Sequence, residues 1–208
     1  MAKEILKRVY LIRHGETDPN KNQIIQGSGL DASLNDTGKK QANDFFRAYH
    51  HIKFDAVYTS NLIRTWQSVS PFLELKLKHY PLEELNEISW GVKDGTKIDP
   101  AEQKIYQAML DNWQAGLLDQ CFDKGESPNT VAKRLKKGMI EIMAKSEEHT
   151  ILVCSHGRAI RILLCHLLNR PLSEMEQFLH SNLCLYILDW DGKEWSITLK
   201  NDTSHILY

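Results

Sequence analysis

The sequence predicts an α/β fold in three layers, with an open, mostly parallel sheet and helices on both faces. Short runs rich in β-branched and aromatic residues alternate with longer segments of helical periodicity along the 208 residues. Such alternation is typical of parallel sheets with helical crossovers. The last two strand-like runs are joined by Asp191-Gly192. This dipeptide is a hairpin signal, so the sheet is expected to have an antiparallel edge.

The expected elements follow one another in a regular order. Strands are expected at residues 8–12, 55–59, 77–80, 150–154, 183–188 and 194–199. Helices are expected at residues 36–49, 61–70, 100–118, 127–145 and 157–168. Asp36 or Thr37 is expected to cap the first helix, and Ser60 the second, which Pro71 should stop. Pro128 suits the first turn of the fourth helix.

Length and composition indicate one globular domain. We expect it to span residues 1–208, with a helical insertion or cap at about 88–128. Hydrophobic residues make up 42% and charged residues 25% of the chain, which is enough to bury a sizeable core. The formal net charge of −1 predicts neither a nucleic-acid partner nor an anionic membrane partner. An anionic substrate would therefore need a local cluster of positive charge.

Targeting and metal signals are weak. The N-terminus lacks the apolar segment of a signal peptide, and the most apolar stretch, 151–168, is interrupted by charged and histidine side chains. The four cysteines form no C-x-x-C pair, which favours buried free thiols. We expect a cytoplasmic protein without a metal site. The histidines without ligand spacing are His50, His51, His79, His149, His166, His180 and His205.

Cationic and imidazole side chains follow three of the expected strands. The first strand ends at Arg13 and His14, the second is followed by Arg64, and the strand at 150–154 is followed by His156. Ligands of open α/β sheets bind outside the carboxyl ends of the strands, so these groups should meet around one anion. Guanidinium groups match phosphate geometry. Nearby positive charge also lowers the pKa of an imidazole and leaves it a neutral nucleophile.

The residues around His14 carry a resemblance. Leu11-Ile12-Arg13-His14-Gly15-Glu16-Thr17 resembles the L-x-R-H-G-x-T signature of the histidine phosphatase superfamily, the phosphoglycerate mutase-like proteins. The resemblance runs from about Val9 to the late strands and implies a phosphoglycerate mutase-like fold. Further segments agree in order and spacing: Asn20, Gln26-Gly27, Leu34 to Gly38 with Gln41-Ala42, Tyr58-Thr59-Ser60 with Arg64-Thr65, Leu85-Asn86-Glu87-Ile88, and Ser155-His156-Gly157.

The resemblance implies a role for each catalytic residue. His14 would attack phosphorus and form a phosphohistidine. Arg13, Arg64 and His156 would hold the non-bridging oxygens. Glu87 would protonate the leaving oxygen and then help to activate water or a second acceptor.

A second set of residues is expected to bind the phosphate or the substrate. Asn20, Gln26 and Gly27 resemble the family's phosphate-contacting loop, although such residues are also common in ordinary loops. Ser60 is most simply a helix cap, and the second interpretation is a contact with the active histidine. Since arginines supply the positive charge, neither a metal nor a cofactor is expected.

The segment after Glu87 separates two kinds of enzyme. Cofactor-dependent phosphoglycerate mutases continue with His-Tyr-Gly and carry paired arginines for the substrate carboxylate. Here the run is Ser89-Trp90-Gly91, and no Arg-Arg pair occurs between Lys97 and Thr150. A mutase must retain an acidic substrate while the phosphoenzyme waits, so the missing cations favour transfer to water.

The sequence therefore predicts a phosphatase that acts on a small phosphorylated metabolite. One alternative is a 2,3-bisphosphoglycerate-dependent phosphoglycerate mutase. The other is a noncatalytic phosphate-binding module on the same fold, since fold does not fix function. The sequence carries no signal for an oligomeric state.

Overall fold

One sheet runs through the computed structural model, which describes residues 4–207. Its order is β3-β2-β4-β1-β5-β6. The first four strands in this order pair in parallel, whereas β5 and β6 form an antiparallel edge, as predicted. The strands are β1 (Lys7–Arg13), β2 (Ala56–Thr59), β3 (Lys78–Pro81), β4 (Thr150–Ser155), β5 (Leu185–Trp190) and β6 (Trp195–Asp202).

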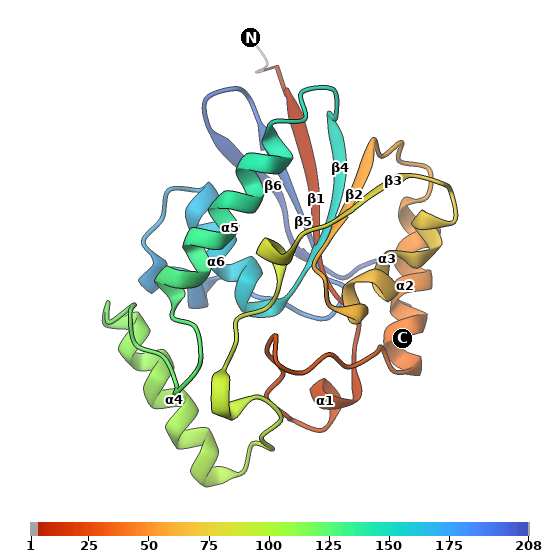
Figure 1. Cartoon of the computed structure of the whole chain (residues 1–208). Helices are drawn as coiled ribbons and strands as arrows, with labels where there is room; N and C mark the ends of the chain where they lie inside the picture. The colour runs from red at the N-terminus through yellow and green to blue at the C-terminus, as the bar shows by residue number, and fades with distance from the viewer. Residues whose placement is uncertain (1–3, 208) are drawn as a thin grey trace.

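Helices cover both faces of the sheet (Figure 1). Helices α2 and α3 pack on one face, and α5 and α6 on the other, whereas α4 lies away from the sheet, beyond the ends of its strands. The α-helices are α1 (Asp18–Lys21), α2 (Asp36–Tyr49), α3 (Ile63–Leu73), α4 (Pro100–Gln114), α5 (Pro128–Met143) and α6 (Gly157–Leu167). Short 3₁₀ helices are η1 (Glu83–Leu85), η2 (Gly91–Lys93) and η3 (Leu172–Gln177).

Alternate residues of β1 pack into two different hydrophobic cores. Val9 and Leu11 pack with α5 and α6, whereas Tyr10 and Ile12 pack with α2 and α3. Leu11 and Ile12 are fully buried, and each such side chain contributes about 1.5–3 kcal/mol on leaving water. β1 is therefore anchored on both faces up to its carboxyl end, where Arg13 and His14 follow.

The predicted helix caps are corrected by the structure. Asn35, rather than Asp36 or Thr37, caps α2, because its side-chain oxygen accepts the N–H of Gly38 at 2.9 Å. Ser60 does not cap α3. The capping position belongs to Leu62, which has no side-chain acceptor, and Ser60 accepts the N–H of that leucine at 3.1 Å.

Pro71 does not stop α3, which continues to Leu73. A proline inside a helix leaves the carbonyl four residues earlier without its N–H donor. That carbonyl belongs to Gln67, and the hydroxyl of Ser70 donates to it at 3.1 Å. The replacement donor allows the helix to run two residues past the proline.

The four cysteines are free thiols. Cys154, Cys165 and Cys184 are buried, and Cys121 is exposed.

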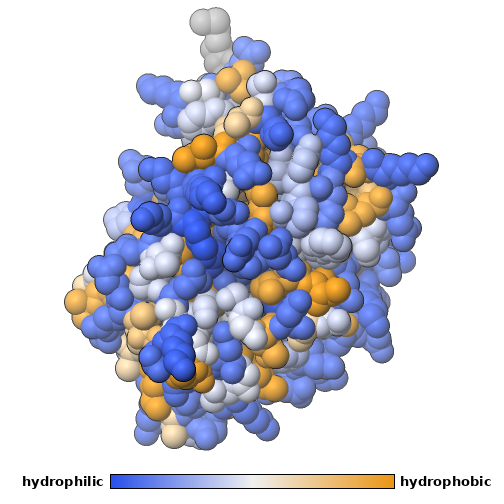
Figure 2. All heavy atoms as spheres, in the orientation of Figure 1, coloured by the Kyte–Doolittle hydropathy of each residue, from blue (hydrophilic) through white to orange (hydrophobic). Residues whose placement is uncertain are grey.

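No helix within residues 4–207 is long and apolar enough to cross a membrane. Figure 2 shows mostly hydrophilic residues on one face, with apolar ones scattered among them. The division into one domain with a cap at about 88–128 stays a prediction; we call this stretch the cap segment.

Candidate active site

The strand ends bring the predicted groups together. β2, β4 and β1 are neighbours in the sheet, so the residues that follow them meet at one edge. The rings of His14 and His156 have centroids 5.1 Å apart. Nε of Arg64 lies 3.2 Å from Nδ1 of His156. The convergence predicted from the sequence is therefore present in the structure.

His14 has the hydrogen bonding of a nitrogen nucleophile. It is 3% exposed, and its Nδ1 lies 2.7 Å from the carbonyl oxygen of Gly15. A carbonyl can only accept, so Nδ1 carries the proton and Nε2 keeps its lone pair. Burial, together with the charges of Arg64 and Arg13, holds the pKa of His14 well below its usual range. The imidazole is therefore neutral at physiological pH.

His156 has both ring nitrogens engaged by the protein. Its Nδ1 accepts from Nε of Arg64, since a guanidinium only donates. Its Nε2 therefore carries the proton and donates to Oγ of Ser60 at 2.8 Å. Burial and the neighbouring Arg64 lower the pKa of His156. Here the imidazole orients Arg64, and its predicted contact with phosphate stays a prediction.

The two guanidiniums are held by protein acceptors to different extents. Nη1 and Nη2 of the fully buried Arg64 donate to carbonyl oxygens of Leu30 at 2.9 Å and Gly27 at 3.2 Å. Burial lowers the pKa of Arg64 to about 10, so it stays charged at neutral pH. Nη1 of Arg13 donates to the carbonyl of His180 at 2.7 Å. Nε of Arg13 is buried without a partner among residues 4–207, so this donor is free to bind an anion.

His180 was not singled out from the sequence, which left it among the scattered histidines. Its Nδ1 lies 3.2 Å from Nη1 of Arg13, 167 positions away in the chain. A methyl group on Gly157 would lie 3.1 Å from the same nitrogen, so the glycine lets the ring pack closely. Burial and the charge of Arg13 lower the pKa of His180 to about 2. No local pattern marks this residue, because its loop reaches the site only through the fold.

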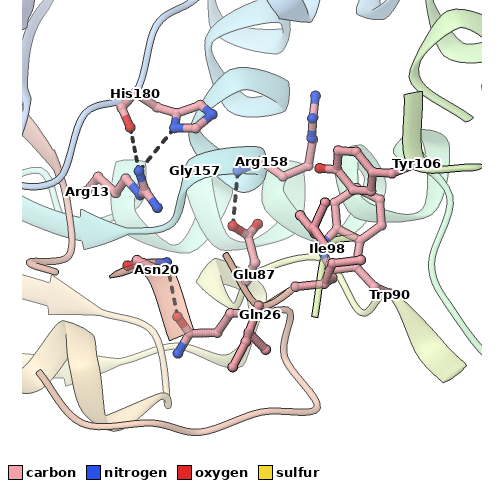
Figure 3. A pocket seen from close by; sticks show the side chains of 12 residues that line it. Arg13, Asn20, Gln26, Glu87, Trp90, Ile98, Tyr106, Gly157, Arg158 and His180 are labelled. Atoms are coloured by element: carbon pink, nitrogen blue, oxygen red, sulfur yellow. Dashed lines mark hydrogen bonds between the residues drawn. The ribbon is translucent and has the colours of Figure 1, made fainter. Parts of the chain in front are cut away.

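Of these groups, Arg13 and His180 line a cavity of about 180 Å³ (Figure 3). This volume is below the roughly 300–1,000 Å³ of pockets for drug-sized ligands. An adjoining cavity of about 430 Å³ shares Arg13, Asn20, Ile24 and Ile98 with it. His14, Arg64 and His156 are not among the described residues that line the cavity of about 180 Å³. That lining consists of Arg13, Asn20, Ile24, Ile25, Gln26, Glu87, Trp90, Ile98, Tyr106, Gly157, Arg158 and His180.

Gln26 and Asn20 lie on the side of the cavity opposite His180 (Figure 3). Oε1 of Gln26 accepts from Oγ1 of Thr17 at 2.7 Å and from Nδ2 of Asn20 at 3.3 Å. These bonds fix the amide orientation, and Nε2 of Gln26 is buried without a partner in the described chain. A second donor is thus available to an anion, and Asn20 acts here by holding Gln26.

Glu87 lines the cavity and also caps α6. Its Oε1 accepts the N–H groups of Ile88 and Ala159, both at 2.9 Å, and its Oε2 accepts that of Arg158 at 3.0 Å. The residue at the capping position, His156, makes no side-chain cap bond. A carboxylate from a distant loop therefore satisfies the orphan N–H groups of this helix start.

Asp94 joins the cap segment to the predicted phosphate loop. Its two carboxylate oxygens accept the N–H groups of Gly27 at 2.7 Å and Gly29 at 3.1 Å. A side chain at Gly27 would place its first carbon 2.4 Å from Oδ1 of Asp94, so this contact requires glycine. Within residues 4–207, no group of three or more His, Cys, Asp or Glu side chains could hold a metal ion.

The fold and the site define a class of phosphoryl-transfer enzyme built around a neutral histidine. The chain belongs to the histidine phosphatase superfamily (branch 1), whose family model matches residues 9–203. It is 27% identical to a probable phosphoglycerate mutase, GpmB, of Erwinia tasmaniensis, over 96% of this chain and 94% of that protein. It is 28% identical to phosphoserine phosphatase 1 of Hydrogenobacter thermophilus, with the same coverage. The solved structure of Bacillus stearothermophilus YhfR superposes with a TM-score of 0.85, at 25% identity, over 97% of this chain and all of that one.

Proposed function

We propose that this enzyme hydrolyses a small phosphomonoester through a phosphohistidine on His14. The observation that carries the proposal is the protonation pattern of His14: Nδ1 holds the proton, Nε2 is free, and two guanidiniums stand nearby. A neutral imidazole with a free lone pair is the form that can attack phosphorus. The positive charges stabilise the anionic oxygens of the transition state.

In the first step, Nε2 of His14 forms a bond to phosphorus while the ester P–O bond breaks. Glu87, in its acid form, gives its proton to the leaving oxygen. In the second step, water attacks the phosphohistidine and the P–N bond breaks. The carboxylate of Glu87 takes the proton of that water, so free His14 and inorganic phosphate are released.

The remaining polar groups would hold the phosphate. Nε of Arg13 and Nε2 of Gln26 are buried donors without protein partners in the described chain. Arg64 has N–H groups beyond the three that the protein uses. Asn20 and Ser60 act indirectly in this scheme, Asn20 through Gln26 and Ser60 through His156. The backbone of Gly27 orients Arg64 by accepting from Nη2.

The lining of the cavity favours hydrolysis over mutase activity. The cap segment contributes Trp90, Ile98 and Tyr106 to the described lining, and none of these is a cation; Arg158 of α6 is the one cation there besides Arg13. A mutase must hold a bisphosphorylated acid while the phosphate moves. The relatives include a phosphoserine phosphatase and a probable phosphoglycerate mutase. The test therefore measures both phosphatase and mutase activity. We also propose that the enzyme works in the cytoplasm.

The test compares products from two substrates. An aryl phosphate and 3-phosphoglycerate, the latter with its bisphosphate cofactor, are each incubated with the purified chain. We expect inorganic phosphate from the aryl ester and an acid-labile phosphoenzyme that His14→Ala abolishes. Efficient interconversion of 2- and 3-phosphoglycerate would overturn the hydrolase assignment. Absence of any acid-labile label with every substrate would identify a binding module instead.

A further inference from the structure

Two arginines of α6 share a single carboxylate beside the cavity. Arg158 and Arg161 both form ion pairs with Glu176 of η3. The side chains of Arg158 and Arg161 are 6% and 12% exposed, so water screens them little. Arg158, Arg161 and Glu176 together, which we call the α6 group, therefore carry one net positive charge. A surplus charge in such surroundings is costly unless a ligand supplies its partner.

Arg158 is held where that charge faces the cavity. It lines the cavity and lies next to Tyr106 (Figure 3). Its guanidinium stacks over the rings of Trp113 at 5.5 Å and Trp90 at 5.9 Å. Nε of Arg161, one helical turn further along α6, is buried without a partner in the described chain. Arg161 is not among the described residues that line the cavity, so Arg158 is the arginine of this pair that can contact an anion there.

His180 adds a neutral donor on the same side of the cavity. Because its Nδ1 accepts from Arg13, its proton is on Nε2. No hydrogen bond to this Nε2 is found among residues 4–207, and the ring lines the cavity. In Figure 3 His180 and Arg158 both lie across the cavity from Asn20 and Gln26. Gln26 and this second set thus lie on different sides of one small space, and Arg13 stands next to His180 through their hydrogen bond.

We infer that Arg158, with His180 beside it, binds a carboxylate of the substrate, so that the preferred substrates are short phosphomonoesters bearing one carboxylate. The inference rests on the proposed hydrolysis at His14. Charge matching selects the carboxylate: with Glu87 in its acid form, Arg13 and Arg64 balance the phosphate dianion, and the α6 group has one spare positive charge. A second phosphate would bring more negative charge than this group can balance. Arg13 and Arg158 line the same cavity of about 180 Å³, so the two acidic groups that they would bind must lie close together.

The experiment uses a matched pair of substrates, 3-phosphoglycerate and glycerol 3-phosphate, which differ by a carboxylate against a hydroxymethyl group. We expect the wild type to prefer the acid in kcat/KM. In Arg158→Met that preference should fall by roughly 10- to 100-fold, as expected when one partner of a buried charge pair is removed. Arg158→Lys should keep part of it, since the charge remains.

Glu176→Gln separates binding from mere support of the fold. It breaks the same ion pairs but leaves both arginines, so the preference for the acid should be kept or increased. If the pair were only structural, Glu176→Gln and Arg158→Met would change the preference in the same direction, and the inference would be wrong. Arg170→Gln is the matched control: it removes an arginine paired with Glu174 of η3 that does not line this cavity. We expect this substitution to leave kcat/KM unchanged for both 3-phosphoglycerate and glycerol 3-phosphate.

The two proposals fail differently. If the wild type hydrolyses an aryl phosphate through an acid-labile phosphoenzyme but does not prefer 3-phosphoglycerate to glycerol 3-phosphate, only the carboxylate site is refuted. If no ester is hydrolysed and no phosphoenzyme forms, the proposed function is refuted. In that case, weakened binding of 3-phosphoglycerate by Arg158→Met, measured by calorimetry, would still support the carboxylate site, and unchanged binding would reject it.

Discussion

The two sides of the cavity differ in how their side chains are held. On the phosphate side, His14, Arg64 and His156 follow neighbouring strands, are at most 3% exposed and are oriented by protein hydrogen bonds. On the leaving-group side, Ile98 and Tyr106 of the cap segment are only partly buried. A reaction that needs fixed nitrogens is built on the rigid sheet. The partly buried cap residues can vary without removing these nitrogens, so they can adjust substrate choice beyond the carboxylate site proposed at Arg158.

The largest effect should come from the phosphate side. His14→Ala removes the nucleophile, so we expect turnover to fall by about 10⁴-fold or more. Trapping at acid pH with radiolabelled substrate should show no phosphoenzyme. His50→Ala, which removes an exposed histidine, is the control and should label normally. A labelled His14→Ala protein would show that another residue carries the phosphate.

Glu87→Gln should have the next largest effect. Glutamine keeps a side-chain oxygen for the N–H groups at the start of α6 but cannot give up a proton, so the chemical step should slow by roughly 10²- to 10⁴-fold. The loss should be greater for alkyl phosphates than for aryl phosphates, because a poor leaving group needs the proton more. An equal loss for both kinds of ester would remove Glu87 from the role of acid.

The buried imidazoles should make stability depend on pH. The pKa values of His14, His156 and His180 are all lowered in the folded protein. Above about pH 6.5 these groups are neutral in both states, so they add no pH dependence. Below it, the unfolded chain takes up protons that the folded chain does not, and stability falls. Each such histidine adds up to about 1.4 kcal/mol per pH unit to the slope.

Urea unfolding between pH 7.5 and 5 measures this slope. The interval avoids most of the titration of carboxylates. His14→Gln should reduce the slope, whatever its effect on absolute stability. A free energy of unfolding that does not change over the interval would show that the site takes up protons without unfolding.

The smallest effect should come from the cap segment. Ile98→Ala removes part of the apolar wall, so KM should change by at most roughly 10-fold. The size of the change should depend on the leaving group of the ester. The phosphoenzyme should form as in the wild type. A large loss of phosphoenzyme formation would mean that the two sides of the cavity are not separable in this way.

The phosphate side was largely predictable from the sequence. β1 could be predicted because its residues alternate between two hydrophobic cores. The Arg13-His14-Gly15 run stands at its carboxyl end. The meeting of Arg64 with His156 follows from strand order in a parallel sheet, which is a general rule. The roles of the individual site residues nonetheless stay predictions.

Other features could not be predicted, because they depend on contacts between distant segments. His180 reaches Arg13 across 167 positions. Glu87 was predicted as an acid, but its capping of α6 depends on where its loop lies. Pro71 was expected to end a helix, and the rescue by Ser70 needs the helix to be formed already. Sequence patterns record local preferences, whereas these bonds are consequences of the assembled fold.

Asp94 holds the backbone of Gly27 and Gly29 through two hydrogen bonds. Gln26 directly precedes this backbone and lines the cavity, as do Trp90 and Ile98 on either side of Asp94 in the chain. A substitution that displaced Asp94 would therefore also displace the buried donor of Gln26, so these two parts of the lining are mechanically coupled.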